Sequence, residues 1–425
     1  MAELEPLRGI RYNPDLVKLG GVLAPPYDVI GADEQDALYG RNMRNAVRIE
    51  LGKDYGDDVA GERDRYTRAR EHLDSWLKLN VLVRDEQPSF YVNTHEFQDH
   101  NGVAQTRHGV LGLVAAEPWQ RSQLRPHERT MSGPKQDRLA LLRATRVQTS
   151  PVFVLAANAA GLLELLHDAA QPPALLGGRT EGDHGPEKHL LWRREDNEWH
   201  THLAEALRGA RLYVADGHHR YETMVTFARE QGQDTSVSST AERVQCLVYI
   251  ADATDPAVMI LPTHRLVRPG AGVAFSLDDL WARLDDSFEV EQARSLMHAM
   301  DRIEALRVQH HAFAVVAADG VAVLRRERRG GASGREQLDV TVLEDEVLAP
   351  AGVGSEAIEA GALSYTRDTG ELRSAVQHRD AVLGFGLNPV TPAELIAVAD
   401  AGDTMPQKST YFFPKVPTGL VFNPV

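Results

Sequence analysis

The sequence predicts a mixed α/β fold built from mixed sheets, hairpins and βα units. Apolar segments flank Asn101-Gly102 and, later, Asp319-Gly320, and both dipeptides suit the tight turn of a hairpin. An apolar strand over Arg211–Ala215 is followed by a helical pattern over Tyr221–Gln231, which is a βα unit. Hairpins together with βα units are typical of layered α/β or α+β proteins.

The other expected elements follow the same two periodicities. Helices are expected over 63–79, 132–146 and 201–207 and from Thr391, where Glu394 completes a capping-box pattern. Strands are expected over 89–92, 110–114, 150–155, 244–249, 258–261, 313–316, 321–324 and 381–386. Loops rich in Gly, Pro or polar residues are expected over 169–188, 232–242 and 329–335. We expect three regions: 1–155, 156–270 and 271–425.

Composition limits the class of protein. The 425 residues are 43% hydrophobic and 25% charged, which is ordinary for a soluble globular chain. A formal net charge of −15 disfavours binding to bulk nucleic acid. The single cysteine, Cys246, excludes an intramolecular disulfide and lies in an apolar run that predicts a buried, structural thiol. With no signal-peptide pattern and no membrane-length apolar run, the sequence predicts a cytoplasmic protein without a membrane partner.

The segment Tyr213–Glu222 is the strongest candidate for a functional centre. It joins the predicted strand to the predicted helix through Asp216-Gly217-His218-His219-Arg220. The first N–H groups of a helix carry partial positive charge, and a glycine lets a ligand approach the backbone. His218, His219 and Arg220 add further cationic or potentially cationic groups, which oppose the helix dipole unless an anion binds there. The turn is therefore predicted to bind phosphate.

Two features of this turn stay open on the sequence alone. Asp216 is either the N-cap of the helix or a carboxylate that acts as a general base or orients a metal ion or hydroxyl group. Adjacent histidines project in different directions, so His218 and His219 are not expected to chelate one metal ion together. One of the two can be a packing residue.

Separate polar clusters are further candidates for the phosphate site. Each has an alternative interpretation: a solvated basic face for the first cluster and the helix start, a surface arginine for the strand end, and ordinary packing of the aromatic residues for the last segment. Because clustered basic and polar groups in an acidic protein are explained by a shared ligand, we expect them to converge on the turn. They are His127 and Glu128, Lys135 and Arg138 at a helix start, Thr263, His264 and Arg265 after an apolar strand, and Lys408 in the aromatic segment 407–415. The turn Ala24–Ile30 contains Asp28, for which a structural role is favoured.

Taken together, these motifs resemble the bacterial and archaeal family called DUF1015. The matching segments are Ala24–Ile30, His127–Thr130 with Lys135–Arg146, Ala215–Glu222, Leu261–Val267 and Met405–Lys415. The family name implies no activity.

The central turn also resembles, more distantly, the signature of the ParB/sulfiredoxin-like fold, whose members bind nucleotides and include a free serine kinase. The resemblance covers about a quarter of the chain. It implies that Asp216 stands at an acidic catalytic position and that Gly217–Arg220 form a phosphate-binding turn. The Gly-x-x-x-x-Gly-Lys-Ser/Thr pattern of P-loop proteins does not occur.

The leading hypothesis is an enzyme that transfers or removes a phosphoryl group on a small metabolite such as serine or another hydroxy compound. Asp216, His218 and His219 would be catalytic, and the partner would be a phosphorylated small molecule, with Mg²⁺ and ATP or ADP as cofactors. A second hypothesis is a nucleotide-binding switch without turnover. A third is a metal-dependent hydrolase that uses His218, His219, His127 and His264, although no metal site follows from their spacing.

Overall fold

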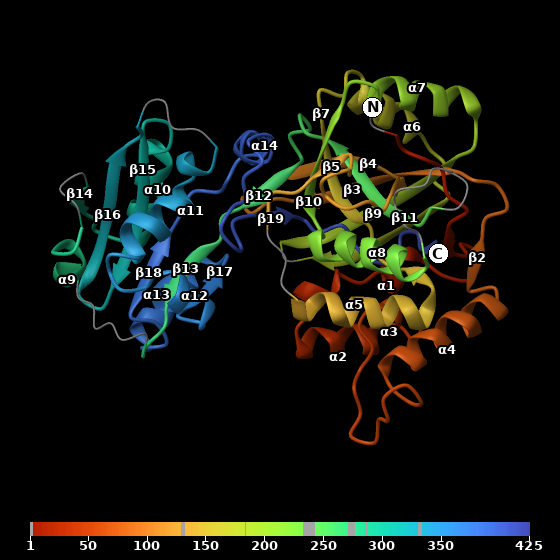
Figure 1. Cartoon of the computed structure of the whole chain (residues 1–425), viewed down its shortest axis with the longest axis horizontal. Helices are drawn as coiled ribbons and strands as arrows, with labels where there is room; N and C mark the ends of the chain where they lie inside the picture. The colour runs from red at the N-terminus through yellow and green to blue at the C-terminus, as the bar shows by residue number, and fades with distance from the viewer. Residues whose placement is uncertain are drawn as a thin grey trace. The chain divides into compact units, whose positions relative to one another are not determined.

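The computed structural model divides into two compact units, which are described separately (Figure 1). It describes residues 3–128, 132–182, 184–232, 243–270, 277–284, 288–329 and 334–425. The first unit comprises Met1–Pro126, Thr130–Met259 and Pro414–Val425, and the second comprises His127–Arg129 and Ile260–Phe413. This division differs from the three expected regions, because the expected boundary at 155 lies inside a central strand of the first unit's sheet.

An eight-stranded mixed sheet forms the centre of the first unit. Its order is β5 (Leu124–Arg125), β10 (Arg211–Asp216), β7 (Val152–Ala157), β11 (Gln245–Asp252), β4 (Ala104–Ala115), β3 (Phe90–Gln98), β9 (Gly185–Arg194) and β8 (Leu176–Gly182). Strands β7 and β11 are parallel, whereas β4, β3, β9 and β8 are successively antiparallel. The hairpin predicted around Asn101-Gly102 is confirmed as β3–β4, with Gly102 at φ 76°.

Helices lie on both sides of these strands in the view of Figure 1, with α6 and α7 on one side and α5 and α8 on the other. The helices of this unit are α1 (Leu19–Val22), α2 (Ala32–Arg41), α3 (Val47–Glu50), α4 (Arg65–Lys78), α5 (Ser132–Thr145), α6 (Leu162–Ala169), α7 (Asn197–Leu207) and α8 (His218–Glu230). Apolar side chains of β7, β10 and β11 pack with those of α6, α7 and α8 into one core. Cys246 is buried in this core, as predicted for a structural thiol.

The prediction of a loop over 169–188 is wrong, because most of this segment forms the hairpin β8–β9. The glycines that suggested a loop allow close packing instead. A Cβ atom on Gly178 would lie 2.0 Å from the backbone N of Gly20 in α1, so a side chain there would force the helix away from the sheet. The expected loops over 232–242 and 329–335 lie mostly outside the described residues.

The second unit has its own antiparallel sheet and its own core. The sheet order is β14 (Glu289–Gln292), β16 (Gly320–Glu327), β15 (His310–Ala317), β18 (Leu383–Gly386), β13 (His264–Val267) and β17 (Leu363–Thr366). The hairpin predicted at Asp319-Gly320 is confirmed as β15–β16. Helices α10 (Leu296–Leu306) and α13 (Thr369–Gln377) contribute apolar side chains to the core. The predicted capping box of Thr391 and Glu394 begins α14 (Pro392–Asp400).

None of the helices that the structure describes is both long and apolar enough to cross a bilayer.

Candidate functional site

The predicted turn at Asp216–Arg220 connects β10 to α8, and the helix begins at His218, three residues before its predicted start. Gly217 is the N-cap residue, with φ 93° in the left-handed region that favours glycine. A Cβ atom at this position would lie 2.9 Å from Nε of Arg220. Glycine therefore lets the chain turn sharply and lets the arginine fold back over the turn.

The carboxylate of Asp216 lies between two cationic side chains. Lys415 donates from Nζ to Oδ1 at 2.8 Å, and Arg220 donates from Nη2 to Oδ2 at 2.6 Å. The side chains of Asp216 and Lys415 are only 17% and 11% exposed, so both ion pairs are screened weakly by water. The contacts of Asp216 thus identify it as the counter-ion of two cations, while Gly217 occupies the N-cap position.

These charges set the protonation state of Asp216. Burial alone would raise its pKa, but the charges of Lys415 and Arg220 outweigh burial and hold the pKa well below the usual range of an aspartate. Asp216 is therefore ionised at neutral pH. A general base works best when its pKa lies near the working pH, so this carboxylate is suited to orienting neighbouring groups and poorly suited to accepting a proton.

Arg220 connects the turn to a small polar cavity that Arg138 and Glu50 also line. Its Nη1 donates to the carbonyl oxygen of Pro151, and its pKa is raised because the charge of Asp216 outweighs desolvation. Together with Arg138 and Glu50 it lines a cavity of about 30 Å³, enough for roughly one water molecule. Arg138 donates from Nη1 to the Glu50 carbonyl oxygen at 2.8 Å, and the Glu50 carboxylate accepts from two neighbouring hydroxyl groups, those of Thr149 and Ser150.

The N-terminal turn Ala24–Ile30 also lies near this cavity. The guanidinium of Arg138 stands 4.0 Å from the ring centroid of Tyr27. The charge of Asp28 contributes to the raised pKa of Arg220, after the larger effects of desolvation and of Asp216. Residues of one predicted motif therefore lie beside the central turn.

The remaining predicted residues of the first unit lie on α8 or contact it. Lys135 of α5 forms an ion pair at 2.8 Å with Glu222, which also accepts from the indole of Trp119. His218 is buried, with its ring centroid 6.3 Å from that of Trp119. The His219 carbonyl oxygen accepts from the hydroxyl of Thr223.

Six predicted binding residues belong to the second unit: His127, Glu128, Thr263, His264, Arg265 and Lys408. Arg265 is buried and donates to the carbonyl oxygens of Thr263, Gln407 and Lys408. His264 is buried and accepts from the backbone N–H of Leu387 at 3.2 Å.

Burial, and then the charge of Arg265, lower the pKa of His264 to about 4, so it is neutral at pH 7. Nε2 of His127 lies 3.1 Å from the Thr410 hydroxyl oxygen. The backbones of Glu128 and Met405 form an isolated parallel β-bridge. The convergence of these residues on the turn stays a prediction.

The contact that best defines the site was missed in the sequence. From the sequence, Lys408 is selected from the candidate segment 407–415. In the structure it is Lys415, from the same segment, that pairs with Asp216, 199 positions away along the chain. No local pattern encodes so distant a pairing. The hydrolase hypothesis names His218, His219, His127 and His264. None of these four belongs to the group of potential metal ligands found among the described residues.

Comparison with known proteins assigns the family and adds distant structural similarities. A conserved hypothetical protein from Pyrococcus furiosus is 14% identical, with 73% of this chain and 93% of that chain covered and a TM-score of 0.36. A free serine kinase in complex with AMP is 13% identical, with 73% and 92% covered and a TM-score of 0.37. SbnI with a C-terminal truncation, from Staphylococcus aureus, is 13% identical, with 72% and 85% covered and a TM-score of 0.33.

No curated protein sequence matches the chain significantly. The family model described as "Protein of unknown function (DUF1015)" matches residues 4–341, which is well over half of the 425 residues. The chain therefore belongs to the DUF1015 family.

Proposed function

We propose that this protein binds the phosphate groups of a nucleotide at the turn Asp216–Arg220 and transfers a phosphoryl group to a small hydroxy compound such as serine. The observation that carries the proposal is the pairing of Asp216 with both Lys415 and Arg220. Two cations held beside the first turn of a helix provide a local site for an anion in a protein with a formal net charge of −15.

The chemistry of phosphoryl transfer suits this arrangement. Catalysis in such reactions consists mostly of positioning the reactants and neutralising the charge on the phosphoryl oxygens. An ammonium group has three N–H donors, so Lys415 can contact a carboxylate and a phosphate oxygen at once. Asp216 would keep Lys415 and Arg220 oriented and would align the acceptor hydroxyl group.

A magnesium ion would have to enter with the phosphates. Both oxygens of Asp216 contact cationic side chains, so this carboxylate alone offers a divalent ion little room. Mg²⁺ typically keeps several waters and is held by one or two carboxylates together with substrate phosphates, where it neutralises phosphate charge.

Nucleotide binding is tested by comparing Lys415→Gln with Lys53→Gln. Lys53 is also in an ion pair of the first unit, with Asp36, and serves as the matched control. We expect ATP and ADP, with Mg²⁺, to raise the unfolding temperature of the wild type and of Lys53→Gln. Lys415→Gln should bind at least about tenfold more weakly, because charge-assisted hydrogen bonds contribute roughly 1.5–3 kcal/mol.

Turnover is tested separately by incubating the protein with ATP and candidate hydroxy acceptors and measuring ADP and phosphorylated product. Phosphorylated product supports a transferase, and inorganic phosphate alone supports a phosphohydrolase. Nucleotide binding without either product supports the alternative, a nucleotide-dependent switch. Equal nucleotide affinity in Lys415→Gln and the wild type would remove the site from the proposal.

A further inference from the structure

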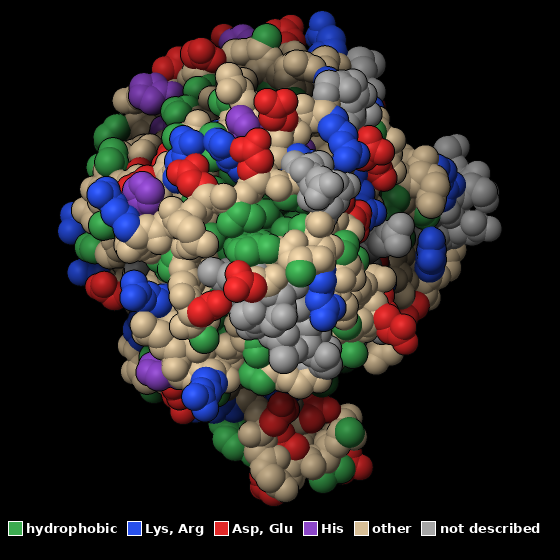
Figure 2. All heavy atoms as spheres, turned by 90° about the vertical axis from the view of Figure 1, so that its left-hand side faces the viewer, with side chains coloured by type: hydrophobic (Ala, Val, Ile, Leu, Met, Phe, Trp, Pro, Cys, Tyr) green, Lys and Arg blue, Asp and Glu red, His purple; other side chains and the backbone are tan. Residues whose placement is uncertain are grey.

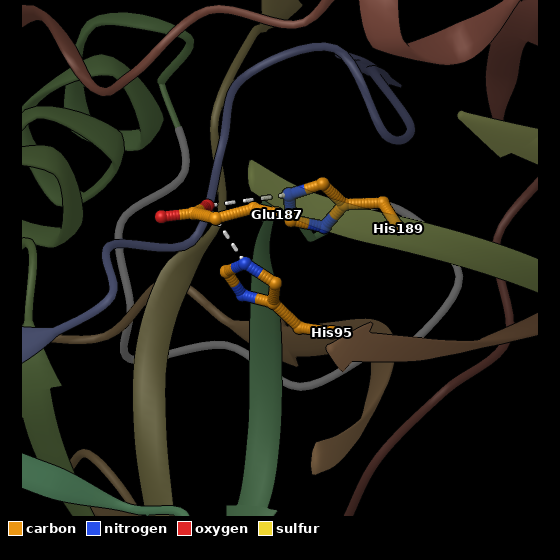
Figure 3. Close-up of side chains that lie close together, drawn as sticks. All are labelled: His95, Glu187 and His189. Atoms are coloured by element: carbon orange, nitrogen blue, oxygen red, sulfur yellow. Dashed lines mark hydrogen bonds and ion pairs between the residues drawn. The ribbon is translucent and has the colours of Figure 1, made fainter. Parts of the chain in front are cut away.

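Three side chains on two neighbouring strands of the first unit gather into one cluster (Figure 3). His95 of β3 and His189 of β9 are directly opposite each other in the antiparallel register. Glu187 stands two positions before His189, so it faces the same side of the sheet. Figure 3 shows both imidazoles pointing toward the Glu187 carboxylate.

The distances in this cluster are close to those of a metal site. Nε2 of His95 is 2.8 Å from Oε2 of Glu187, and Nε2 of His189 is 3.8 Å from the same oxygen. All the candidate ligand atoms lie within 4.8 Å of one another. Ligands of a tetrahedral zinc ion, with bonds of about 2.0–2.1 Å, are separated by roughly 3.3 Å. A small rotation of the Glu187 side chain would therefore make room for an ion.

Burial prepares these groups in the protonation state that a metal ion requires. Both histidines are buried, and desolvation lowers the pKa of His95 to about 3 and lowers that of His189 as well. The Glu187 carboxylate is mostly buried, but its interactions with the two histidines outweigh desolvation and lower its pKa to about 2. Neutral imidazoles and an ionised carboxylate are the forms that coordinate a metal ion. Coordination through Nε2 of His95 also requires the ring proton to move from Nε2, where it faces Glu187, to Nδ1.

One ring nitrogen of His189 is left over by the protein's own hydrogen bonds. Among the residues that the structure describes, its buried Nδ1 has no hydrogen-bond partner, which is uncommon for a buried polar atom. A Cβ atom at Gly182 would lie 2.1 Å from Oε1 of Glu187, so the space for this carboxylate depends on a glycine.

Arg107 limits which ions this cluster can bind. It stands opposite His95 on β4, and its Nη2 lies 3.4 Å from Nδ1 of His95 and 2.8 Å from the carbonyl oxygen of Pro414. Its positive charge opposes any cation, so weakly bound hard ions such as Mg²⁺ and Ca²⁺ are disfavoured. Ions that bind imidazole strongly are favoured, and Zn²⁺ is the best fit to two histidines and one carboxylate.

We propose that His95, Glu187 and His189 bind one Zn²⁺ ion, which links β9 to β3. The second carboxylate oxygen of Glu187 or a water molecule would complete the coordination. The proposal shares no residue with the nucleotide site proposed above, so either proposal can fail without the other.

The test uses the full-length protein, purified without a polyhistidine tag and stripped of metal with a chelator. Zn²⁺ titration against a competing indicator should give one tight site per chain. Co²⁺ should give a d–d absorption spectrum of low-symmetry coordination, which needs no variant. Glu187→Gln and His189→Gln should each weaken Zn²⁺ binding by about 100-fold or more, since each removes a ligand.

His311→Gln is the matched control, because His311 is also a buried histidine paired with a carboxylate, at 2.9 Å from Asp339. It should keep the tight site. Circular dichroism would show that the variants are folded, and ATP binding by Glu187→Gln should equal that of the wild type. The proposal is overturned if the wild type binds no stoichiometric Zn²⁺. Equal affinities in the cluster variants and the control would likewise show adventitious binding to other histidines.

Discussion

Asp216 shows how a distant partner changes the interpretation of one residue. From sequence, this side chain is either a helix cap or a catalytic carboxylate. In the structure, Gly217 is the N-cap and Asp216 is the shared counter-ion of Lys415 and Arg220. An asparagine would substitute well for a capping aspartate, but it cannot balance two buried cations.

We therefore expect Asp216→Asn to destabilise the protein by about 3 kcal/mol, because removing one partner of a buried ion pair leaves uncompensated charge. The measurement is denaturant unfolding at pH 7. Asp196→Asn is the matched control: Asp196 caps α7 by accepting from the N–H of Trp199, and asparagine caps equally well. Adding Lys415→Met to Asp216→Asn should cost less than the sum of the two single changes. Additive costs would show that the two side chains do not interact.

His264 gives a prediction for the dependence of stability on pH. Its folded pKa of about 4 lies below its usual value, so the unfolded chain binds a proton more readily. The stability that depends on neutral His264 is fully present above about pH 6.5 and is lost as pH falls toward 4, to a total of about 3 kcal/mol. His264→Asn, whose amide oxygen can accept from the N–H of Leu387, should flatten this part of the curve. Equal slopes for both proteins between pH 6.5 and 4 would contradict the prediction.

At the scale of elements, the C-terminal segment 414–425 holds the first unit together. The Pro414 carbonyl oxygen accepts from Arg107, and Lys415 reaches Asp216. Further along, Phe422 and Ile10 exchange backbone hydrogen bonds. This segment thus joins the candidate site to the start of the chain.

Phe422→Ala should destabilise the first unit by about 3–5 kcal/mol, the usual cost of removing a buried phenylalanine ring. Phe422 is fully buried, with its ring centroid 6.1 Å from that of Tyr12. The measurement is the free energy of unfolding in urea. Val103→Ala, at a position of the same unit that is 54% exposed, should change it by less than about 0.5 kcal/mol. A similarly small effect at Phe422 would mean that the segment contributes little to stability.

Elements encoded by local patterns were predictable, and contacts between distant residues were not. Asn101-Gly102 and Asp319-Gly320 marked two hairpins. Gly102 adopts the positive φ that such a turn can require, whereas neither Asp319 nor Gly320 has a positive φ and Gly320 already pairs within β16. The hairpin β8–β9 was mistaken for a loop, since Gly178 serves close packing against Gly20. The pairing of Lys415 with Asp216 and the cluster of His95 with His189 depend on strand order and register, which periodicity does not reveal.

At the scale of the whole molecule, two features matter: the surface charge and the division of the chain into two compact units. Figure 2 shows basic and acidic side chains interspersed on the face that it presents. The formal net charge of −15 predicts weak attraction for a polyanion, and this stays a prediction. Each unit has its own sheet and its own buried core, and separate cores are the physical mark of parts that can fold alone.

The fragment 260–413 should accordingly fold without the rest of the chain. It retains all six strands of the second sheet and the apolar core that α10 and α13 complete. It lacks His127–Arg129. The lost contacts include that of His127 with Thr410 and the backbone hydrogen bond from Met405 to His127, each contributing about 1 kcal/mol, which together is less than the stability of a typical domain. The fragment should show a cooperative urea transition, which Phe313→Ala in the buried centre of β15 should shift by about 3–5 kcal/mol. A fragment without a cooperative transition, or one unaffected by Phe313→Ala, would mean that the second unit depends on the first for its fold.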